Sequence, residues 1–313
     1  MKILFIFLDG IGLGENNPLT NPFAQARMPF LERLLDGRRL ISDHAAYNGT
    51  NASLLSLDAC LNVAGVPQSA TGQATLLTGI NIPAQIGYHY GPKPNPEISA
   101  YLKNGNVFSQ VIQAGKRCSF LNAYPPVYFK NIQNGRRLNA AIPMAAISAG
   151  LSLRTVQDLH AGTAISADFT ASGWRKHLGL DQTPLSTPNE AGRRLAGLAQ
   201  SYDFSLFEYW LSDYAGHQQD MQAAKGLLEI LDQVLEGVYQ AWEPSCGLIL
   251  LTSDHGNMED LSTRRHTLNP VPALLIGERQ VRQTFQENLV DISGISPAIL
   301  RTINMPAEPR PAV

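Results

Sequence analysis

The stretch that decides the fold reads CGLILLTSDHGNMEDLSTRRHTLNPVPALLIG over residues 246–277. Its apolar run, 247–251, ends in Thr-Ser-Asp-His-Gly, which is the pattern of a buried parallel strand. In open α/β sheets the chemistry lies at the carboxyl ends of the strands, so Asp254 and His255 are predicted to stand there together. His266 follows on a polar loop, before a second apolar run at 271–277. One carboxylate and two imidazoles in this setting suit a divalent metal ion.

Two more predicted strands are followed by acids. The apolar run at 3–8 is followed by Asp9, and the predicted strand at 204–211 is followed by Asp213 and His217, four residues apart. We expect three strand ends to present Asp9, Asp213 and Asp254 together with three histidines. Two divalent ions about 4 Å apart could be held by such a set, and two ions can clamp the attacking and leaving oxygens of a displacement.

The order of apolar runs and helical patterns predicts an α/β fold with a doubly wound, mostly parallel sheet flanked by helices. A strand is also predicted at 117–123. Helical spacing is seen in four segments: 28–35, 106–115, 190–200 and 221–242. The polar character of one internal stretch divides the chain into three parts: core 1–123, an inserted cap 124–186, and core 187–313.

The predicted cap is basic and irregular in its sequence pattern. It holds six cations against three acids, so its net charge is 6 − 3 = +3, and the rest of the chain carries −2 − 3 = −5. A basic cap over an acidic, metal-binding core suggests an anionic substrate between them. The alternative is a solvated accessory segment, and the sequence leaves both open. The candidate substrate-binding residues are Arg136, Arg137, Arg154 and Arg175.

Composition sets further limits. A net charge of −2 and a pI near 6.4 argue against nucleic-acid binding, and three cysteines without CxxC spacing fit a reducing compartment. No stretch approaches the roughly 20 apolar residues that cross a bilayer, and the N-terminal run is too short for a signal peptide. We therefore expect a soluble, cytoplasmic protein with no membrane or nucleic-acid partner. The oligomeric state is left open.

The segment 66–79 predicts a loop that enters a helix closed by Gly79. A hydroxyl at the start of such a helix lies in the positive field of its N-terminus, which suits a nucleophile that accepts negative charge. Ser69 and Thr71 are the hydroxyls in this place. The ordinary alternative is that they cap the helix.

Taken together, these motifs resemble the alkaline phosphatase superfamily, and its cofactor-independent phosphoglycerate mutase and phosphopentomutase branch most closely. The resemblance rests on four segments: Leu8-Asp9-Gly10, Asp213-Tyr-Ala-Gly-His217, Asp254-His-Gly-Asn257 with His266-Thr-Leu-Asn-Pro-Val-Pro272, and the terminal helix pattern at 291–300. It covers the core and not the cap.

The resemblance implies one metal ion at Asp9, Ser69, Asp254 and His255, and a second at Asp213, His217 and His266. It also implies that Ser69, ten residues before Gly79, is the nucleophile, with Thr71 as the competitor. Since no thiolate is among the ligands, Mn²⁺ or Zn²⁺ is expected.

The function expected from these residues is phosphoryl transfer on a small phosphorylated metabolite. The enzyme would be a phosphomonoesterase or phosphomutase that acts through a phosphoserine intermediate. Two alternatives remain: a phosphodiesterase or phosphonate hydrolase on the same site, and a metal-bound binding module without turnover.

Overall fold

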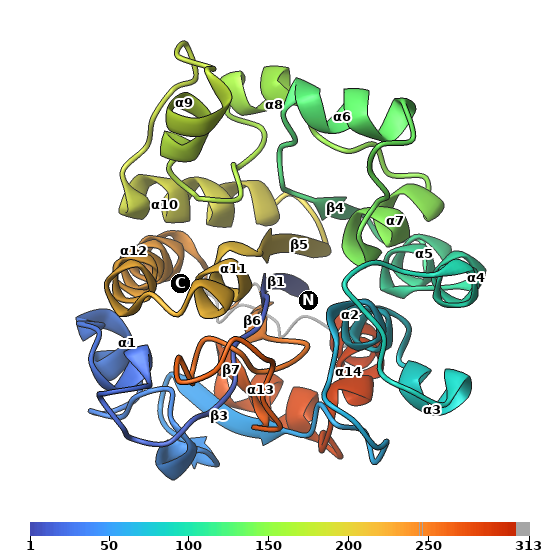
Figure 1. The fold of residues 1–313 in the computed structure, drawn as a ribbon. Coiled ribbons are helices and arrows are strands. Elements are labelled where there is room, and N and C mark those ends of the chain that lie inside the picture. Colours follow the sequence, from blue (N-terminus) through green and yellow to red (C-terminus); the bar gives the residue numbers. More distant parts are fainter. Residues whose placement is uncertain (244, 246, 305–313) are drawn as a thin grey trace, which may run out of the picture.

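A computed structural model describes residues 1–243, 245 and 247–304. In this part of the chain, a sheet of seven strands lies between two layers of helices (Figure 1). The strand order is β2-β3-β7-β6-β1-β5-β4. The strands have these bounds: β1 Lys2–Leu8, β2 Tyr47–Asn48, β3 Ala52–Leu57, β4 Cys118–Phe120, β5 Phe204–Tyr209, β6 Gly247–Thr252 and β7 Val271–Ile276.

The α/β class and the flanking helices are confirmed, and the sheet is mixed. The centre and one edge are parallel: β1 pairs with β5 and β6, and β4 pairs with β5. The other edge is antiparallel, because β7 runs against β6, β3 against β7, and β2 against β3. The three central parallel strands β6, β1 and β5 all end on the same side of the sheet.

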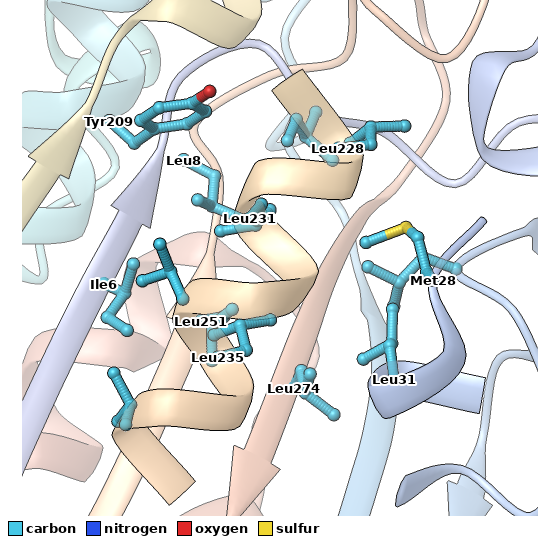
Figure 2. Packing of buried hydrophobic residues seen from close by; sticks show 14 of the residues in the cluster. Ile6, Leu8, Met28, Leu31, Tyr209, Leu228, Leu231, Leu235, Leu251 and Leu274 are labelled. Carbon is cyan, nitrogen blue, oxygen red and sulfur yellow. The ribbon is translucent and has the colours of Figure 1, made fainter. Parts of the chain in front are cut away.

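Alternate residues of β1 point to opposite faces and enter two different cores. Leu4, Ile6 and Leu8 pack in one core, and Ile3, Phe5 and Phe7 pack in the other. The first core is covered by α1 (Pro29–Leu34), α10 (Pro188–Ala199) and α12 (Met221–Ala241). Figure 2 shows Leu228, Leu231 and Leu235 of α12 beside the sheet, with Leu31 of α1 nearby.

The second core is covered by the other helical layer, with bounds α2 Ser69–Thr78, α3 Ile82–Ile86, α4 Pro96–Asn104, α5 Val107–Gln113, α13 Arg279–Gln286 and α14 Ile295–Ile303. Short 3-10 turns lie at Pro22–Ala24, Ser42–His44 and Ile292–Gly294. No described helix has the length and apolar character that a bilayer crossing requires.

The segment 124–186 contains four helices joined by irregular loops. It forms α6 Pro126–Gln133, α7 Ala141–Ser148, α8 Val156–His160 and α9 Ser172–Leu178. Two features account for these helices: Thr155 forms a capping box at α8, and apolar side chains such as Trp174 and Leu159 bury in a small core of their own. Helix α7 packs instead on the second core of the main body. The division into core and cap stays a prediction.

Candidate metal centre

The parallel centre of the sheet delivers the predicted acids to one place. Asp9 follows β1, Asp254 follows β6 on one side of it, and Asp213 lies shortly after β5 on the other side. Since these three strands are neighbours and end on the same side, their carboxylates meet at the sheet's carboxyl edge.

Asp213 and His217 lie in a helix, because the chain turns into α11 (Leu211–Gln218) soon after β5. The four-residue spacing therefore places both side chains on one helical face. Gly216 has a packing role: a Cβ there would lie 2.6 Å from the side chain of Asn257, whose amide donates to Asp213 at 2.7 Å.

The three predicted histidines turn the same ring nitrogen toward the acids. Each Nδ1 faces a backbone carbonyl: Gly256 for His255 (3.3 Å), Arg264 for His217 (2.7 Å) and Pro67 for His266 (2.8 Å). A carbonyl only accepts, so a neutral ring carries its proton on Nδ1 and leaves the Nε2 lone pair free. This is the arrangement that orients histidines as metal ligands.

The Nε2 atoms and carboxylate oxygens lie within a few ångströms of one another. His255 Nε2 is 3.5 Å from Asp9 Oδ1 and 3.6 Å from Asp254 Oδ2. Asp213 lies 3.3 Å from His217 Nε2 and 3.6 Å from His266 Nε2. The two rings of His255 and His266 stack with their centroids 3.7 Å apart.

Two groups of ligand atoms are compact enough to hold an ion. One is Asp213, His217 and His266, the same set that the resemblance implies for one metal. The other is Asp9, Asp213 and His255. This second group contains Asp213, whereas the resemblance implies Asp254. Asp213 is therefore a member of both groups. Asp254 remains within 3.6 Å of His255 at the rim of the second group.

Burial makes this cluster costly without a counter-charge. Asp9 Oδ1 and Asp254 Oδ2 are buried and accept no hydrogen bond from the described residues. Burial, then the neighbouring charges of Asp254 and Asp213, raises the pKa of Asp9 well above its usual range. Burial, then the charge of Asp213, raises the pKa of Asp254 to about 7. Unpaired buried carboxylates of this kind fit a divalent cation.

The surroundings of His255 and His266 also favour the neutral imidazole, which is the form that binds metal ions. Burial lowers the pKa of His255, and burial and the charge of His255 lower the pKa of His266, so both favour the neutral form that binds metals. At Asp213, burial works to raise the pKa, but the hydrogen bonds with His217 and Asn257 act against it and the pKa is lowered. Asp213 therefore stays ionised.

The two candidate nucleophiles lie in different surroundings. Ser69 is the first residue of α2, and its Oγ lies 3.0 Å from His255 Nε2. The Thr71 hydroxyl is fully buried and tied to the neighbouring loop: it donates to the Gln68 carbonyl at 3.1 Å and accepts from the Tyr90 amide at 3.1 Å. Ser69 thus faces the cluster, and Thr71 holds the loop beside it.

A glycine that the sequence did not single out lets α2 approach the cluster. A Cβ on Gly72 would lie 2.8 Å from the Asp254 carbonyl oxygen and 2.9 Å from its Cβ, so the helix can approach this strand end only without a side chain there. Gly72 therefore sets the distance between Ser69 and Asp254.

Replacing Gly72 by alanine is expected to lower the free energy of unfolding by about 1–3 kcal/mol, because two backbones must move apart. Urea unfolding of the metal-free protein measures this. Gly197 of α10 is the matched control, since nothing lies within 4 Å of its Cβ position and alanine there should stabilise by about 0.5–1 kcal/mol. Equal effects at both positions would contradict the close approach.

Glu259 organises the loops around the cluster, and sequence reasoning missed it. It is buried, and its Oε2 accepts the backbone amides of Gly12 (2.9 Å) and Asn257 (2.8 Å). Its Oε1 accepts from the Thr267 hydroxyl and, at 3.1 Å, from the Asn269 amide. One carboxylate thus joins the loop after Asp9 to the loop that carries Asp254, His255 and His266.

Changing Glu259 to glutamine is expected to cost about 2–4 kcal/mol of stability, since one oxygen acceptor becomes a donor that faces donors. Apparent metal affinity should fall by about 10–100-fold. Thermal unfolding and metal titration measure the two effects. The control is Glu287→Gln on the exposed surface, and a Glu259 variant that matches this control in both would refute the organising role.

Of the four candidate arginines, Arg137 alone lines a cavity beside the site. Arg154 is engaged in structural hydrogen bonds, to the Phe120 carbonyl (3.1 Å) and the Ser119 hydroxyl (2.6 Å) among others. Arg175 donates to the Thr183 carbonyl at 2.8 Å, and Arg136 is exposed. A cation outside the predicted set joins Arg137: the charge of Arg137, after burial, lowers the pKa of Lys93.

Comparison with known proteins supports the sequence resemblance. Residues 179–307, less than half of the chain, match the model of the Metalloenzyme superfamily. The 2,3-bisphosphoglycerate-independent phosphoglycerate mutase of Antithamnion sp. is 35% identical over 34% of this chain and 22% of that protein. The enzyme of the same name from Ruegeria pomeroyi is 32% identical over 41% of this chain and 26% of that protein. The match thus spans about a quarter of the length of these relatives.

Solved structures match the fold over nearly the whole chain. The PH0037 protein from Pyrococcus horikoshii has a TM-score of 0.57 at 14% identity, over 97% of this chain and 96% of that one. The alkaline phosphatase from the Antarctic bacterium TAB5 has a TM-score of 0.53 at 12% identity, over 97% and 98%. The fold is therefore alkaline-phosphatase-like. The C-terminal part of the chain matches the Metalloenzyme superfamily, and the chain is similar to the 2,3-bisphosphoglycerate-independent phosphoglycerate mutases.

Proposed function

We propose that this protein is a metal-dependent phosphoryl-transfer enzyme, a phosphomonoesterase or phosphomutase, that acts on a small phosphorylated metabolite. The observation that carries the proposal is the convergence of three histidine Nε2 atoms and three carboxylates at one edge of the sheet, with Ser69 Oγ 3.0 Å from His255 Nε2. The family match and the names of the relatives support it.

Two divalent ions are proposed for the cluster. Asp9, Ser69, Asp254 and His255 would hold one, with Asp213 placed to share it, and Asp213, His217 and His266 would hold the other. Oxygen and imidazole ligands without a thiolate favour Mn²⁺ or Zn²⁺. When bound, such ions neutralise charge on the phosphoryl oxygens and favour the ionised form of a neighbouring hydroxyl.

Ser69 is the proposed nucleophile. Its Oγ attacks phosphorus, the bond from phosphorus to the substrate oxygen breaks, and the leaving oxygen takes up a proton as the alcohol. The N-terminus of α2 favours negative charge at this position, since its first amides have no partners within the helix. Water, or another hydroxyl of the same substrate, then takes the phosphoryl group from Ser69. The first outcome is hydrolysis and the second is isomerisation.

Arg137 and Lys93 are the proposed contacts for the anionic substrate on its approach. Arg137 comes from the predicted cap and Lys93 from the loop after Tyr90, and the charge of Arg137 lowers the pKa of Lys93 after burial does. Cations beside an acidic, metal-binding core attract phosphate esters.

The test is phosphate release from a panel of sugar phosphates, phosphoglycerates and nitrophenyl esters. The protein is assayed after chelation, and again with Mn²⁺ or Zn²⁺ restored. We expect release only with metal, and a mutase assay on phosphoglycerates and pentose phosphates separates isomerisation from hydrolysis. Release of nitrophenol only from nitrophenyl diesters or phosphonates, and not from the monoesters, would reassign the substrate class, and metal binding without turnover of any ester would establish a binding module.

A further inference from the structure

A cavity of about 320 Å³ lies between the predicted cap and the end of β5, and of its lining only Arg137 has a role in the function proposed above. Helices α6 and α9 form its outer walls, and the start of α11 forms its floor. In Figure 1 these helices lie on the β4–β5 side of the sheet, with α11 toward the centre. This volume is at the lower end of the range for small-molecule sites.

The lining includes four large aromatic side chains. Tyr124 and Tyr128 lie with ring centroids 4.2 Å apart, and the Arg137 guanidinium lies over the Tyr128 ring at 4.9 Å. Trp174 and Trp210 complete the aromatic walls. Flat side chains that flank a mostly apolar space favour a flat apolar guest.

The rim of the cavity exposes two large apolar side chains to solvent. Trp210 is 45% exposed and Val127 is 47% exposed, although both are large and apolar. Asp168, the acid of the lining, is occupied by its own loop, because it accepts the amides of Ala171 (3.0 Å) and Gly173 (2.7 Å). Exposed apolar side chains gathered around a hollow mark a binding site.

The cavity adjoins the metal centre through Tyr124 and the start of α11, and none of its described lining residues is itself a proposed metal ligand. Tyr124 lines it, and the Tyr124 hydroxyl donates to Glu208 Oε2 at 3.2 Å. Glu208 lies at the end of β5, near enough for its charge to act on Asp9. Trp210 and Leu211 also line the cavity, and Leu211 begins the helix that carries Asp213. A molecule held at the metal centre by its phosphate can thus extend into the cavity.

We propose that the alcohol portion of the substrate carries an aromatic ring, which this cavity binds. The inference rests on the proposed function, because the phosphate must lie at the metal centre for the ring to reach Tyr124 and Trp210. Ring faces supply the contacts, and the Arg137 guanidinium extends the flat wall.

Binding of inert phosphonates to the metal-loaded protein tests the proposal by calorimetry. The probes are benzyl-, 2-phenylethyl- and 3-phenylpropylphosphonate, each compared with the alkylphosphonate of the same chain that lacks the ring. We expect at least one phenyl compound to bind tenfold tighter or more than its partner, since burial of one ring contributes roughly that much. Equal affinity within all three pairs would overturn the cavity proposal. Binding of none of the six compounds would overturn the proposed function, and this inference with it.

Two variants locate the effect. Trp210→Ala removes one wall, and Val127→Trp fills the space, so each should reduce the advantage of the phenyl compound to about threefold or less. Leu185→Ala is the matched control, because Leu185 is 51% exposed and lies outside the cavity lining. A phenyl advantage that both variants retain in full would place the ring elsewhere and refute the proposal.

Discussion

Ser69→Ala is expected to lower kcat for phosphate release by about 10³-fold or more while the protein still binds metal and stays folded. The reason is geometric. The Ser69 hydroxyl is at the first turn of α2 and 3.0 Å from His255 Nε2, so it adjoins both the helix N-terminus and the metal ligands. Alanine removes the attacking oxygen and leaves the other proposed ligands in place. Steady-state kinetics on the best ester of the panel measures the loss.

A trapped intermediate gives a second measurement of the same prediction. Acid quenching during turnover should leave a phosphoserine at position 69 in the wild type, seen by mass spectrometry of the peptide, and none in the alanine variant. Thr71→Ala is the control. It should cost about 1–3 kcal/mol of stability, because it breaks the hydrogen bonds with Gln68 and Tyr90, yet retain the labelled Ser69. A phosphothreonine at position 71, or full activity of Ser69→Ala, would refute the assignment.

The central sheet was predictable because its signals are local. The runs that became β1 and β6 are continuous and apolar, β5 is rich in aromatic and apolar residues, and each strand is followed closely by the acid that reaches the site. The antiparallel edge was not predictable in this way. Strand β3 pairs with β7 across more than 200 residues, Ala52 against Ile276, and no local pattern encodes that partner.

The same contrast holds at the metal centre. The proposed ligands have a local sequence signal, and the residues that hold them in place do not. Asp254 and His255 carry a recognisable motif, whereas Glu259 is one acid among several on a polar loop. Its role depends on the amide of Gly12, which is 247 residues away in the chain. The close approach of Gly72 to Asp254 also exists only after α2 has packed on the sheet. Single-sequence reasoning finds residues whose chemistry is unusual, and it misses ordinary residues that the fold makes important.

Asp254→Asn is expected to stabilise the metal-free protein and to abolish its stabilisation by metal. Asp254 is fully buried, and burial, then the charge of Asp213, raises the pKa of its carboxyl to about 7, against about 4 in an unfolded chain. Between these values the unfolded state has already lost a proton that the folded state keeps. Stability of the metal-free wild type therefore falls as the pH rises from about 4 to about 7, and stays reduced above that.

Asparagine is nearly isosteric and cannot ionise, so the variant should lack this part of the pH dependence. At pH 8 we expect the metal-free variant to unfold with a free energy about 1–3 kcal/mol higher than the wild type. Added Mn²⁺ or Zn²⁺ should raise the unfolding midpoint of the wild type and barely change that of the variant. Urea and thermal unfolding with chelator or metal measure both effects.

Asp181→Asn is the matched control, because that side chain is exposed in the predicted cap and far in sequence from every proposed ligand. It should reproduce the wild type with and without metal. If Asp254→Asn destabilised the metal-free protein at pH 8, the inference that the buried, ionised Asp254 lowers its stability would be wrong. If metal stabilised the variant as fully as the wild type, Asp254 would not be a ligand, and Asp9, Asp213 and His255 alone would hold the ion. The combined outcome, greater stability without metal and lost response to it, is specific to a buried acid whose charge the metal offsets.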